Sequence, residues 1–382
     1  MNSRANRSSY AAWWWTIDRV ALVLMLVLIT IGLMLAFAAS PAATGGPLTA
    51  GDFRYIIKQI LFAVIAAGIL GGASILSLQQ LKIAAAITFA LALIGSGLVL
   101  FIGSEVLGAT RSIELGLFSL QPSEFLKPGF AVLGAAIIAD RQAMIMPKPL
   151  ITLLLLLPVI AILLLQPDVG QTTLLLALWG ALLFFSGVPL VWMAILGGGS
   201  AALGGIAYTF FPHVHHRIDQ FLNPTGTGYQ TGLALKAFAH GGLTGVGPGA
   251  GTIKYRIPEA HSDFIFAVAG EEFGLILCAV IAALFGFLTI RLLLRAASQR
   301  DRFSQLAGAA LAIVTAFQAF INMGVAVNLL PAKGMTLPFI SYGGSSLFAV
   351  ALTMGFALAV TRQRPQLGAR ESSLFEIWGA RA

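Results

Sequence analysis

The chain has 382 residues, of which 58% are hydrophobic and only 10% are charged. Its repeated apolar stretches are long enough to cross ~30 Å of hydrocarbon, which excludes a soluble globular protein and indicates a polytopic membrane protein. The net charge of +8 does not indicate nucleic-acid binding, because the basic residues lie in short connections and form no basic domain. The single cysteine, Cys278, allows no intramolecular disulfide, so helix packing alone must hold the fold together.

The first apolar stretch, residues 17–37, is too long for the apolar region of a signal peptide and predicts a retained membrane span. The preceding "WWW" at 13–15 is typical of an aromatic anchor at a membrane interface. The hydrophobicity of the whole chain predicts an all-α bundle of ten transmembrane helices, in a single domain of residues 1–382. The predicted helices are 16–39, 55–76, 82–102, 124–140, 149–165, 170–187, 189–211, 263–295, 304–330 and 343–362.

An even number of spans places both termini on one side of the membrane. Most Lys and Arg residues of the short connections fall on that side, including Arg19, Lys82 and Arg291, so the positive-inside rule assigns it to the cytoplasm. The opposite side carries one large extracytoplasmic loop, residues 212–262, between the seventh and eighth helices. Because loops on a rigid scaffold carry function, we expect the chemistry on this outward face.

Asp263 follows "PEAH" and opens the apolar run "FIFAVA", so we expect it at or near the N-terminus of the eighth helix. A helix cap is one interpretation, because a carboxylate there can accept hydrogen bonds from backbone amides. A functional base is the other, because the positive end of the helix dipole keeps a carboxylate ionised where a polar loop meets the membrane. The spacing leaves both interpretations open.

Two further pairs of charged residues lie in apolar surroundings. Glu271 and Glu272 are adjacent and point about 100° apart on a helix, so at least one must face the bundle, where a basic or hydroxyl partner would explain it. In "QPSEFLK", Glu124 and Lys127 lie three residues apart on one helix face. They either neutralise each other or line a polar cavity.

Other polar motifs carry weaker signals. Arg111 suits phosphate recognition through its planar guanidinium, although a solvated loop charge is an equal interpretation. Asp168 in "QPDVG" is expected to cap the sixth helix, and "GVGPGAG" matches neither phosphate-loop pattern. The histidines of "HVHH" have no carboxylate or cysteine at ligand-like spacing, so no metal site is predicted at His213, His215 and His216.

Four motifs in order along the chain resemble the SEDS family of shape, elongation, division and sporulation proteins. They are "QPSEFLKP", "QPDVG", "GLTGVGPGAGTIKYRIPEAHSDFIFAVAGEEFG" and "LLPAKGMTLPFISYGGSS". The resemblance covers nearly the whole chain, with the family's ten spans and its large outward loop, and is closer to division-type than to elongation-type members. One departure is Ser112, where the family commonly has an aromatic residue.

The resemblance implies a peptidoglycan glycosyltransferase that polymerises lipid II into glycan strands for septal wall synthesis, with undecaprenyl diphosphate as the leaving group. Asp263 matches the family's essential acid, which would take the proton from the acceptor sugar's 4-hydroxyl while the anomeric carbon of the donor inverts. Cations or a divalent metal such as Mg or Mn must stabilise the leaving group. The substrate-binding candidates are Arg111, Glu124, Lys127, Lys254, Arg256 and Lys333.

The resemblance also implies partners and a location. These are a single-span class B penicillin-binding transpeptidase and other divisome membrane proteins, at the septum in the bacterial inner membrane, with both termini cytoplasmic. A lipid II flippase is the alternative, but it would need ionisable residues distributed through the membrane. An elongation-type polymerase and a non-catalytic scaffold, in which Asp263 would be dispensable, are the remaining alternatives.

Overall fold

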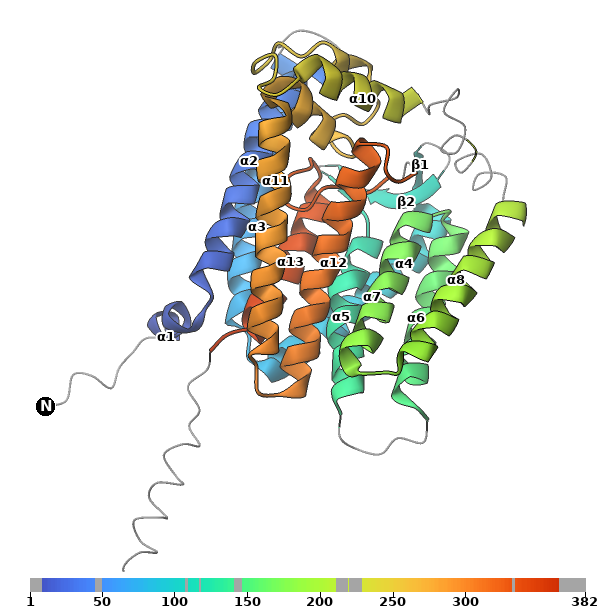
Figure 1. Cartoon of the computed structure of the whole chain (residues 1–382). Coiled ribbons are helices and arrows are strands. Elements are labelled where there is room, and N and C mark those ends of the chain that lie inside the picture. Colours follow the sequence, from blue (N-terminus) through green and yellow to red (C-terminus); the bar gives the residue numbers. More distant parts are fainter. Residues whose placement is uncertain are drawn as a thin grey trace, which may run out of the picture.

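The computed structural model describes residues 9–44, 50–106, 109–116, 118–140, 146–210, 219, 229–331 and 334–363. Within them, a long helix lies on each segment predicted to be a span, and these helices form the bundle in Figure 1. The helices are α2 (Arg19–Thr44), α3 (Ala50–Ile75), α4 (Leu78–Ile102), α5 (Ser123–Ala139), α6 (Lys148–Leu165), α7 (Val169–Ser186), α8 (Leu190–Phe210), α11 (Ile265–Ala297), α12 (Arg302–Ala326) and α13 (Gly344–Val360).

The bundle is that of a polytopic membrane protein. Among the described residues, seven helices are long and apolar enough to cross a membrane by length and composition, and α13 is a shorter apolar helix of 17 residues. Large apolar side chains such as Phe101, Val64 and Leu91 remain exposed on the sides of the bundle. Exposed apolar surface of this kind is expected where lipid rather than water surrounds the helices.

The all-α bundle carries a small β element, in the 103–123 connection. Strands β1 (Ser104–Val106), β2 (Ala109–Glu114) and β3 (Ser119–Leu120) form a three-stranded antiparallel sheet in the order β1-β2-β3. The connection carries β-branched residues such as Val106 and Ile113 outside any long apolar run, and such residues favour extended backbone. Strand β2 packs against α4, and the sheet lies toward the same end of the bundle as α10 (Figure 1).

Shorter helices lie at both ends of the bundle. Helix α10 (Tyr229–Gly241) and the 3-10 helix η2 (Ile253–Arg256) belong to the segment predicted as the large loop, and α10 lies across one end of the bundle (Figure 1). Helix α1 (Ser9–Thr16) lies at the other end. There the amide of Gln363 donates to the carbonyl of Thr16 at 3.1 Å, so the first and last described segments meet at the same end.

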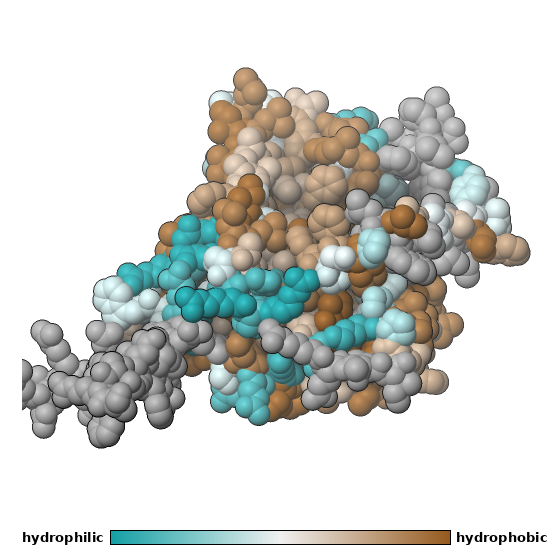
Figure 2. Space-filling model, turned by 60° about the horizontal axis from the view of Figure 1, so that its bottom comes forward, coloured by the Kyte–Doolittle hydropathy of each residue, from teal (hydrophilic) through white to brown (hydrophobic). Residues whose placement is uncertain are grey.

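This second end is polar and is organised by a buried carboxylate. Asp18 is only 4% exposed and accepts hydrogen bonds from Nε of Arg291 (2.9 Å) and of Arg295 (2.8 Å). Burial raises the pKa of Asp18, but the backbone amide of Ala21 and the two arginines outweigh it and hold the pKa below its ordinary value. Figure 2, turned toward this end, shows the hydrophilic side chains gathered there.

Helix α11 is interrupted at Gly274, which has φ +79° and ψ 178°. A Cβ atom there would lie 2.2 Å from the carbonyl oxygen of Leu243, so only glycine fits in this backbone conformation. Backbone groups beyond the interruption bind the segment that follows α10: the amide of Leu275 donates to the carbonyl of Gly242 at 3.0 Å. The break in α11 therefore anchors this segment to the bundle.

The same segment is held by the carboxylate of Glu271, which is fully buried. It accepts hydrogen bonds from the amides of Thr252 (2.8 Å), Ile253 (2.7 Å) and Lys254 (2.9 Å), and it lies 3.0 Å from Nδ1 of His240. A carboxylate that accepts several backbone amides is well satisfied even out of water. Glu271 thus orders the segment through its backbone and not through a basic partner alone.

Its neighbour Glu272 confirms the expected pairing with a basic residue. Its carboxylate accepts from the ammonium of Lys254, which also donates to the carbonyl of Ala38 in α2 at 2.6 Å. Both side chains of the pair are fully buried, so neither charge is compensated by solvent. The pair joins α11, η2 and α2.

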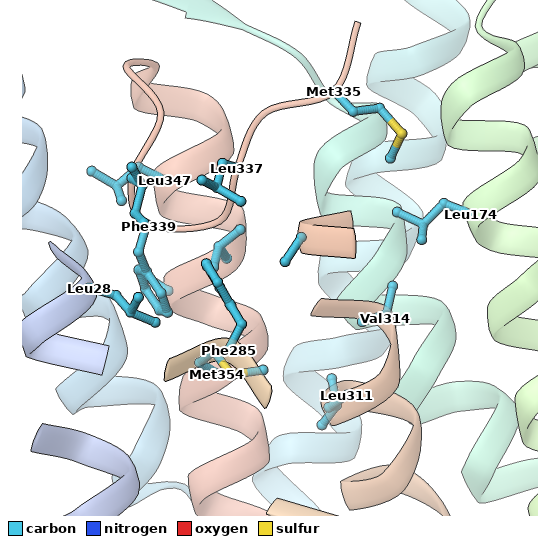
Figure 3. Close-up of a cluster of buried hydrophobic side chains, with 14 of the residues drawn as sticks. Leu28, Leu174, Phe285, Leu311, Val314, Met335, Leu337, Phe339, Leu347 and Met354 are labelled. Atoms are coloured by element: carbon cyan, nitrogen blue, oxygen red, sulfur yellow. The ribbon is translucent and has the colours of Figure 1, made fainter. Parts of the chain in front are cut away.

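The connection between α12 and α13 also enters the bundle. Met335, Leu337 and Phe339 are each at most 2% exposed and belong to one continuous apolar cluster with Leu28 of α2 and Leu174 of α7. Figure 3 shows these side chains between the helices. Burial of these side chains holds the connection within the bundle.

We predict that removing one member of the Lys254–Glu272 pair destabilises the protein more than removing both. Lys254→Met leaves a buried carboxylate without its cation, which typically costs about 3–5 kcal/mol, whereas replacing a pair by apolar residues is often neutral. Thermal unfolding of the detergent-purified protein should therefore show a clear fall in Tm for Lys254→Met, largely recovered in Lys254→Met/Glu272→Leu. Equal losses in the single and double variants would contradict this assignment.

Candidate functional site

Charged side chains from separate segments come together near the end of the bundle at which α10 lies. They are contributed by β2, by the first turn of α5, by the start of α7 and by the turn before α11. The charges of the other members act on the pKa of Asp168 or of Asp263. The group consists of Arg111, Glu124, Lys127, Asp168, Glu259 and Asp263.

Asp263 does not cap α11, so the capping interpretation is wrong. The N-cap residue is Phe264, which makes no side-chain capping hydrogen bond. Asp263 lies in the preceding turn, where its amide donates to the carbonyl of Glu259 at 3.0 Å and its own carbonyl accepts from Nδ2 of Asn322 at 2.8 Å. Across the described ranges, no protein group donates a hydrogen bond to the Asp263 carboxylate, which is therefore available to a ligand.

The surroundings of Asp263 raise its pKa to about 7. Burial is the largest cause, and the negative charge of Glu259 is the next, followed by smaller contributions from Asp168 and Glu124. The guanidinium of Arg111 opposes them by favouring the carboxylate. A carboxyl group with this pKa can both accept and release a proton near neutral pH, which is the property of a general acid or base.

The turn that carries Asp263 is tied to the connection before α13 by two polar side chains. Asn322 of α12 donates from Nδ2 to the carbonyls of Asp263 (2.8 Å) and Met335 (2.6 Å). Ser341 donates from Oγ to the carbonyl of Ser262 at 2.5 Å. Sequence reasoning did not identify Asn322 or Ser341. The only signal for Asn322 was a polar residue inside an otherwise apolar helix, and the only signal for Ser341 was its place in a motif.

Arg111 lies beside Asp168 and close to Asp263. Its Nη2 donates to the carbonyl of Pro167 at 2.8 Å, and its Nε is 4.0 Å from Oδ2 of Asp168. A methyl group on Gly334 would lie 3.2 Å from Oδ2 of Asp263 and 3.3 Å from Nη1 of Arg111, so both side chains border this glycine. Nε of Arg111 is buried and makes no hydrogen bond within the described structure, so it can still donate to an anion.

Asp168 confirms its expected role as the cap of α7. Its Oδ1 accepts a hydrogen bond from the amide of Gln171 at 3.2 Å. Burial raises the pKa of Asp168 above its ordinary value, although Arg111 acts in the opposite direction. The residue thus joins the helix end to the arginine.

Glu124 and Lys127 form the expected pair, with 2.6 Å between Nζ and Oε2, and each is 2% exposed. Lys127 also donates to Oε1 of Gln318 at 2.7 Å, and Glu124 accepts from Nε2 of Gln171 at 2.5 Å. The network links α5, α7 and α12 beneath Arg111. Of the two charges, that of Glu124 contributes to the raised pKa of Asp263.

Two of the remaining candidates, Lys254 and Arg256, are not assembled into this group. The ammonium of Lys254 is fully buried against Glu272 and Ala38, which corrects the expectation that it is free to bind a substrate. Arg256 is exposed in η2, and Lys333 lies outside the described residues. The sequence could not distinguish these cases, because burial of a loop lysine depends on which helix the loop meets.

No group of three or more His, Cys, Asp or Glu side chains that could hold a metal ion occurs among the described residues. The three histidines of "HVHH" at 213–216 lie outside them. Among the carboxylates of the site, Asp168 and Glu124 are already occupied by protein donors.

Comparison with known proteins identifies close relatives. A family described as "Cell cycle protein", whose model is named for FtsW, RodA and SpoVE, matches residues 18–366. The chain is 41% identical over 365 residues to the "Probable peptidoglycan glycosyltransferase FtsW" of Caulobacter vibrioides, a match that covers 95% of this chain and 94% of that relative. It is 36% identical over 359 residues to the protein of the same name from Saccharophagus degradans, covering 89% of this chain and 90% of the relative.

Solved structures share the fold. A chain of the structure described as "Structural coordination of polymerization and crosslinking by a peptidoglycan synthase complex" superposes with a TM-score of 0.76 at 28% identity, covering 92% of this chain and 100% of that chain. The rod shape determining protein RodA of Thermus thermophilus superposes with a TM-score of 0.67 at 26% identity, covering 92% of this chain and 99% of that one.

We predict that the Asp263 carboxyl titrates near neutral pH and that Glu259→Gln lowers its pKa. Removing the charge of Glu259 removes a cause of the raised value, so the midpoint should move to lower pH. Infrared titration of the purified protein, with the Asp263→Asn spectrum subtracted, measures this midpoint. An unshifted midpoint in Glu259→Gln, or a parent midpoint near the ordinary value of about 3.9, would contradict the described electrostatics.

Proposed function

This chain belongs to the cell cycle protein family of FtsW, RodA and SpoVE, the SEDS family that its motifs resemble, and we propose that it is a peptidoglycan glycosyltransferase of the FtsW type. It polymerises lipid II into glycan strands for septal wall synthesis. The identity with two relatives named as probable peptidoglycan glycosyltransferases supports this activity. The observation that carries the chemistry is the Asp263 carboxylate, which has a raised pKa, accepts no protein hydrogen bond among the described residues and lies beside Arg111.

In the proposed reaction, Asp263 removes the proton of the acceptor sugar's 4-hydroxyl as that oxygen attacks the anomeric carbon of the donor. The bond between this carbon and the diphosphate oxygen breaks, the diphosphate leaves with the electron pair, and the configuration inverts. A base with a pKa near 7 is well matched to operation near neutral pH. Hydrogen bonds from Asn322 and within the turn hold its backbone, while its side chain stays accessible.

Arg111 stabilises the negative charge that develops on the diphosphate. Its guanidinium is anchored by Pro167, and its buried Nε makes no hydrogen bond to a described residue, so it is preorganised to donate to a phosphate oxygen. Lys127 adds positive potential from below but is largely neutralised by Glu124. Arg256 and Lys333 remain candidate contacts of the substrate.

Asp168 and Glu124 already accept hydrogen bonds from protein donors, so they do not form a ready site for a metal ion. A divalent cation such as Mg²⁺ or Mn²⁺ would therefore be held mainly by the diphosphate of the substrate. When bound, it would supply further stabilisation of the leaving group.

The proposed setting is the bacterial inner membrane at the division septum, with all ten long helices as spans and both termini cytoplasmic. The predominance of basic residues at the end that carries α1, together with the meeting of Thr16 and Gln363 there, supports this orientation. A single-span class B penicillin-binding transpeptidase is the proposed partner, with other divisome membrane proteins. The similar structure of a synthase complex that coordinates polymerization and crosslinking supports such a pairing.

A lipid II flippase is less well supported. The described ionisable side chains lie toward the two ends of the bundle: Asp263, Lys254 and their neighbours at one end, and Asp18 with its arginines at the other. They do not form the chain of groups through the bundle that a transport path requires. The similarity to two relatives that are both named FtsW likewise favours an FtsW-type over an elongation-type polymerase.

We predict that Asp263→Asn abolishes detectable polymerisation while leaving the fold intact. The substitution preserves size but removes the base, and proton transfer of this kind is typically worth ~10² to 10⁴ in rate. Polymerisation of lipid II by the purified protein, with and without the transpeptidase, measures the effect. Asp301→Asn, a matched change at the cap of α12 at the opposite end, should retain activity. A polymerisation rate for Asp263→Asn close to that of the parent would exclude Asp263 as the base.

We also predict the orientation in the membrane. In a Cys278→Ala background, a cysteine at exposed Thr244 should react with an impermeant thiol reagent in intact cells, and one at exposed Ser298 should react only after the cells are opened. Thr244 lies after α10 and Ser298 at the end of α11, so the two positions report on opposite ends of the bundle. The reverse labelling pattern would overturn the proposed topology.

A further inference from the structure

Three aromatic side chains from separate segments meet beside the proposed active site. Tyr55 belongs to α3, His261 to the turn before α11 and Tyr342 to the connection before α13. The ring centroids are 5.9 Å apart for Tyr55 and His261, 5.3 Å for Tyr55 and Tyr342, and 5.5 Å for His261 and Tyr342. All three are half-buried, and the proposed mechanism gives none of them a role.

The rings of this cluster carry polar groups, whereas the neighbouring rings are phenylalanines. Tyr342 contacts Phe62 at 6.3 Å between centroids, and Phe62 in turn packs against Phe118 and Phe348. The deeper rings are phenylalanines that only fill space, and Phe62 is buried. By contrast, the hydroxyls of Tyr55 and Tyr342 make no hydrogen bond within the described part of the chain. Because both residues are half-buried and neither hydroxyl is among the buried unpaired atoms, these hydroxyls can meet a partner from outside the protein.

The aromatic cluster is rigidly connected to Asp263. His261 is two residues before it, and the carbonyl of His261 accepts a hydrogen bond from the amide of Tyr342 at 3.0 Å. Ser341 holds the intervening Ser262. A group bound on these rings would therefore keep a fixed position relative to the carboxylate, which is what an attacking hydroxyl requires.

Asp263 also has neighbours that do not belong to the aromatic cluster. Its Oδ2 borders Gly334 together with Arg111, and Arg111 is anchored at the start of α7 by Pro167. The rings of Tyr55 and Tyr342 instead come from α3 and from the connection before α13, and α3 packs against α13. The carboxylate thus has a cation beside it, which suits a diphosphate, and belongs to the same turn as one ring of the aromatic cluster.

We propose that Tyr55, His261 and Tyr342 form the subsite for the acceptor sugar. This inference rests on the proposed glycosyltransferase function and deepens it. An N-acetylhexosamine ring has an apolar C–H face that packs on aromatic rings, while its hydroxyl and acetamido groups can hydrogen-bond to the phenol hydroxyls and to the imidazole. The donor diphosphate lies on the Arg111 side, and the acceptor 4-hydroxyl points toward Asp263 from the aromatic side.

The test uses a probe that can act only as an acceptor. The soluble disaccharide N-acetylglucosaminyl-β-1,4-N-acetylmuramic acid has a 4-hydroxyl but no diphosphate to lose. Its binding to the purified full-length Asp263→Asn protein is measured by saturation-transfer NMR, so that no turnover interferes. Tyr55→Leu should weaken this binding about tenfold, or about 1.4 kcal/mol, and Tyr55→Phe/Tyr342→Phe, which keeps the rings, should weaken it less.

Two controls separate a sugar subsite from a general role in packing. Binding of undecaprenyl diphosphate should be unchanged in Tyr55→Leu and weakened in Arg111→Ala. Trp15→Leu removes a ring that is 68% exposed at the opposite end of the bundle, and it should leave disaccharide binding unchanged. Thermal unfolding of each variant identifies any that fail to fold. If Tyr55→Leu fails to fold, the Tyr55→Phe/Tyr342→Phe variant, which keeps both rings, still tests the hydroxyl groups.

The outcomes also separate this inference from the proposed function. If the parent protein polymerises lipid II but Tyr55→Leu binds the disaccharide as tightly as the parent, the aromatic subsite is wrong and the function stands. Weakening of both probes by Tyr55→Leu would likewise overturn the subsite. If the parent does not polymerise lipid II with its transpeptidase present, the proposed function itself fails.

Discussion

The cost of removing charge from water is the constraint on which this structure depends. A carboxylate or ammonium buried in a membrane protein must find a partner, or it loses several kcal/mol of solvation. Lys254 therefore pairs with Glu272, Lys127 with Glu124, and Asp18 with Arg291. The Asp18–Arg291 pair joins the start of α2 to α11, and the Lys254–Glu272 pair joins η2 to α11. The Glu124–Lys127 pair lies within α5 but is linked to α7 and α12 through Gln171 and Gln318, so satisfying the charges also assembles the bundle.

Asp263 is treated differently from these paired residues. Its backbone is held by Glu259 and Asn322, but among the described residues its carboxylate accepts no hydrogen bond. The nearby negative charges and burial make ionisation costly, and the resulting pKa of about 7 is the measure of that cost. Strong restraint of the backbone and weak stabilisation of the charge are together what a proton-accepting residue needs.

The connections around Asp263 owe their shape to contacts with the helices. The break in α11 at Gly274 docks the segment after α10, and the buried Phe339 and Leu337 hold the connection before α13 within the bundle. These connections bring Arg111 close to Asp263 and bring together the rings of Tyr342 and of His261, which is two residues before Asp263. An asymmetric site of this kind can distinguish a diphosphate from a sugar, which gives a polymerase a direction.

The helical segments could be predicted from the sequence alone, because a span needs about 20 apolar residues and its signal is local. The capping role of Asp168 and the pairing of Glu124 with Lys127 were also predictable, since both depend on neighbours within one turn of helix. The resemblance of the motifs to a family singled out Asp263. Composition and spacing alone left it as either a cap or a base.

The tertiary structure decided the rest. The burial of Lys254, the clamp formed by Asn322 and Ser341, the approach of Arg111 to Asp263 and the three-stranded sheet all depend on contacts between distant segments. Burial and partner choice are properties of the folded environment, and they set both the charge that a side chain carries and the direction in which it points. Local sequence determines which residues can ionise, whereas packing determines which of them is left free to react.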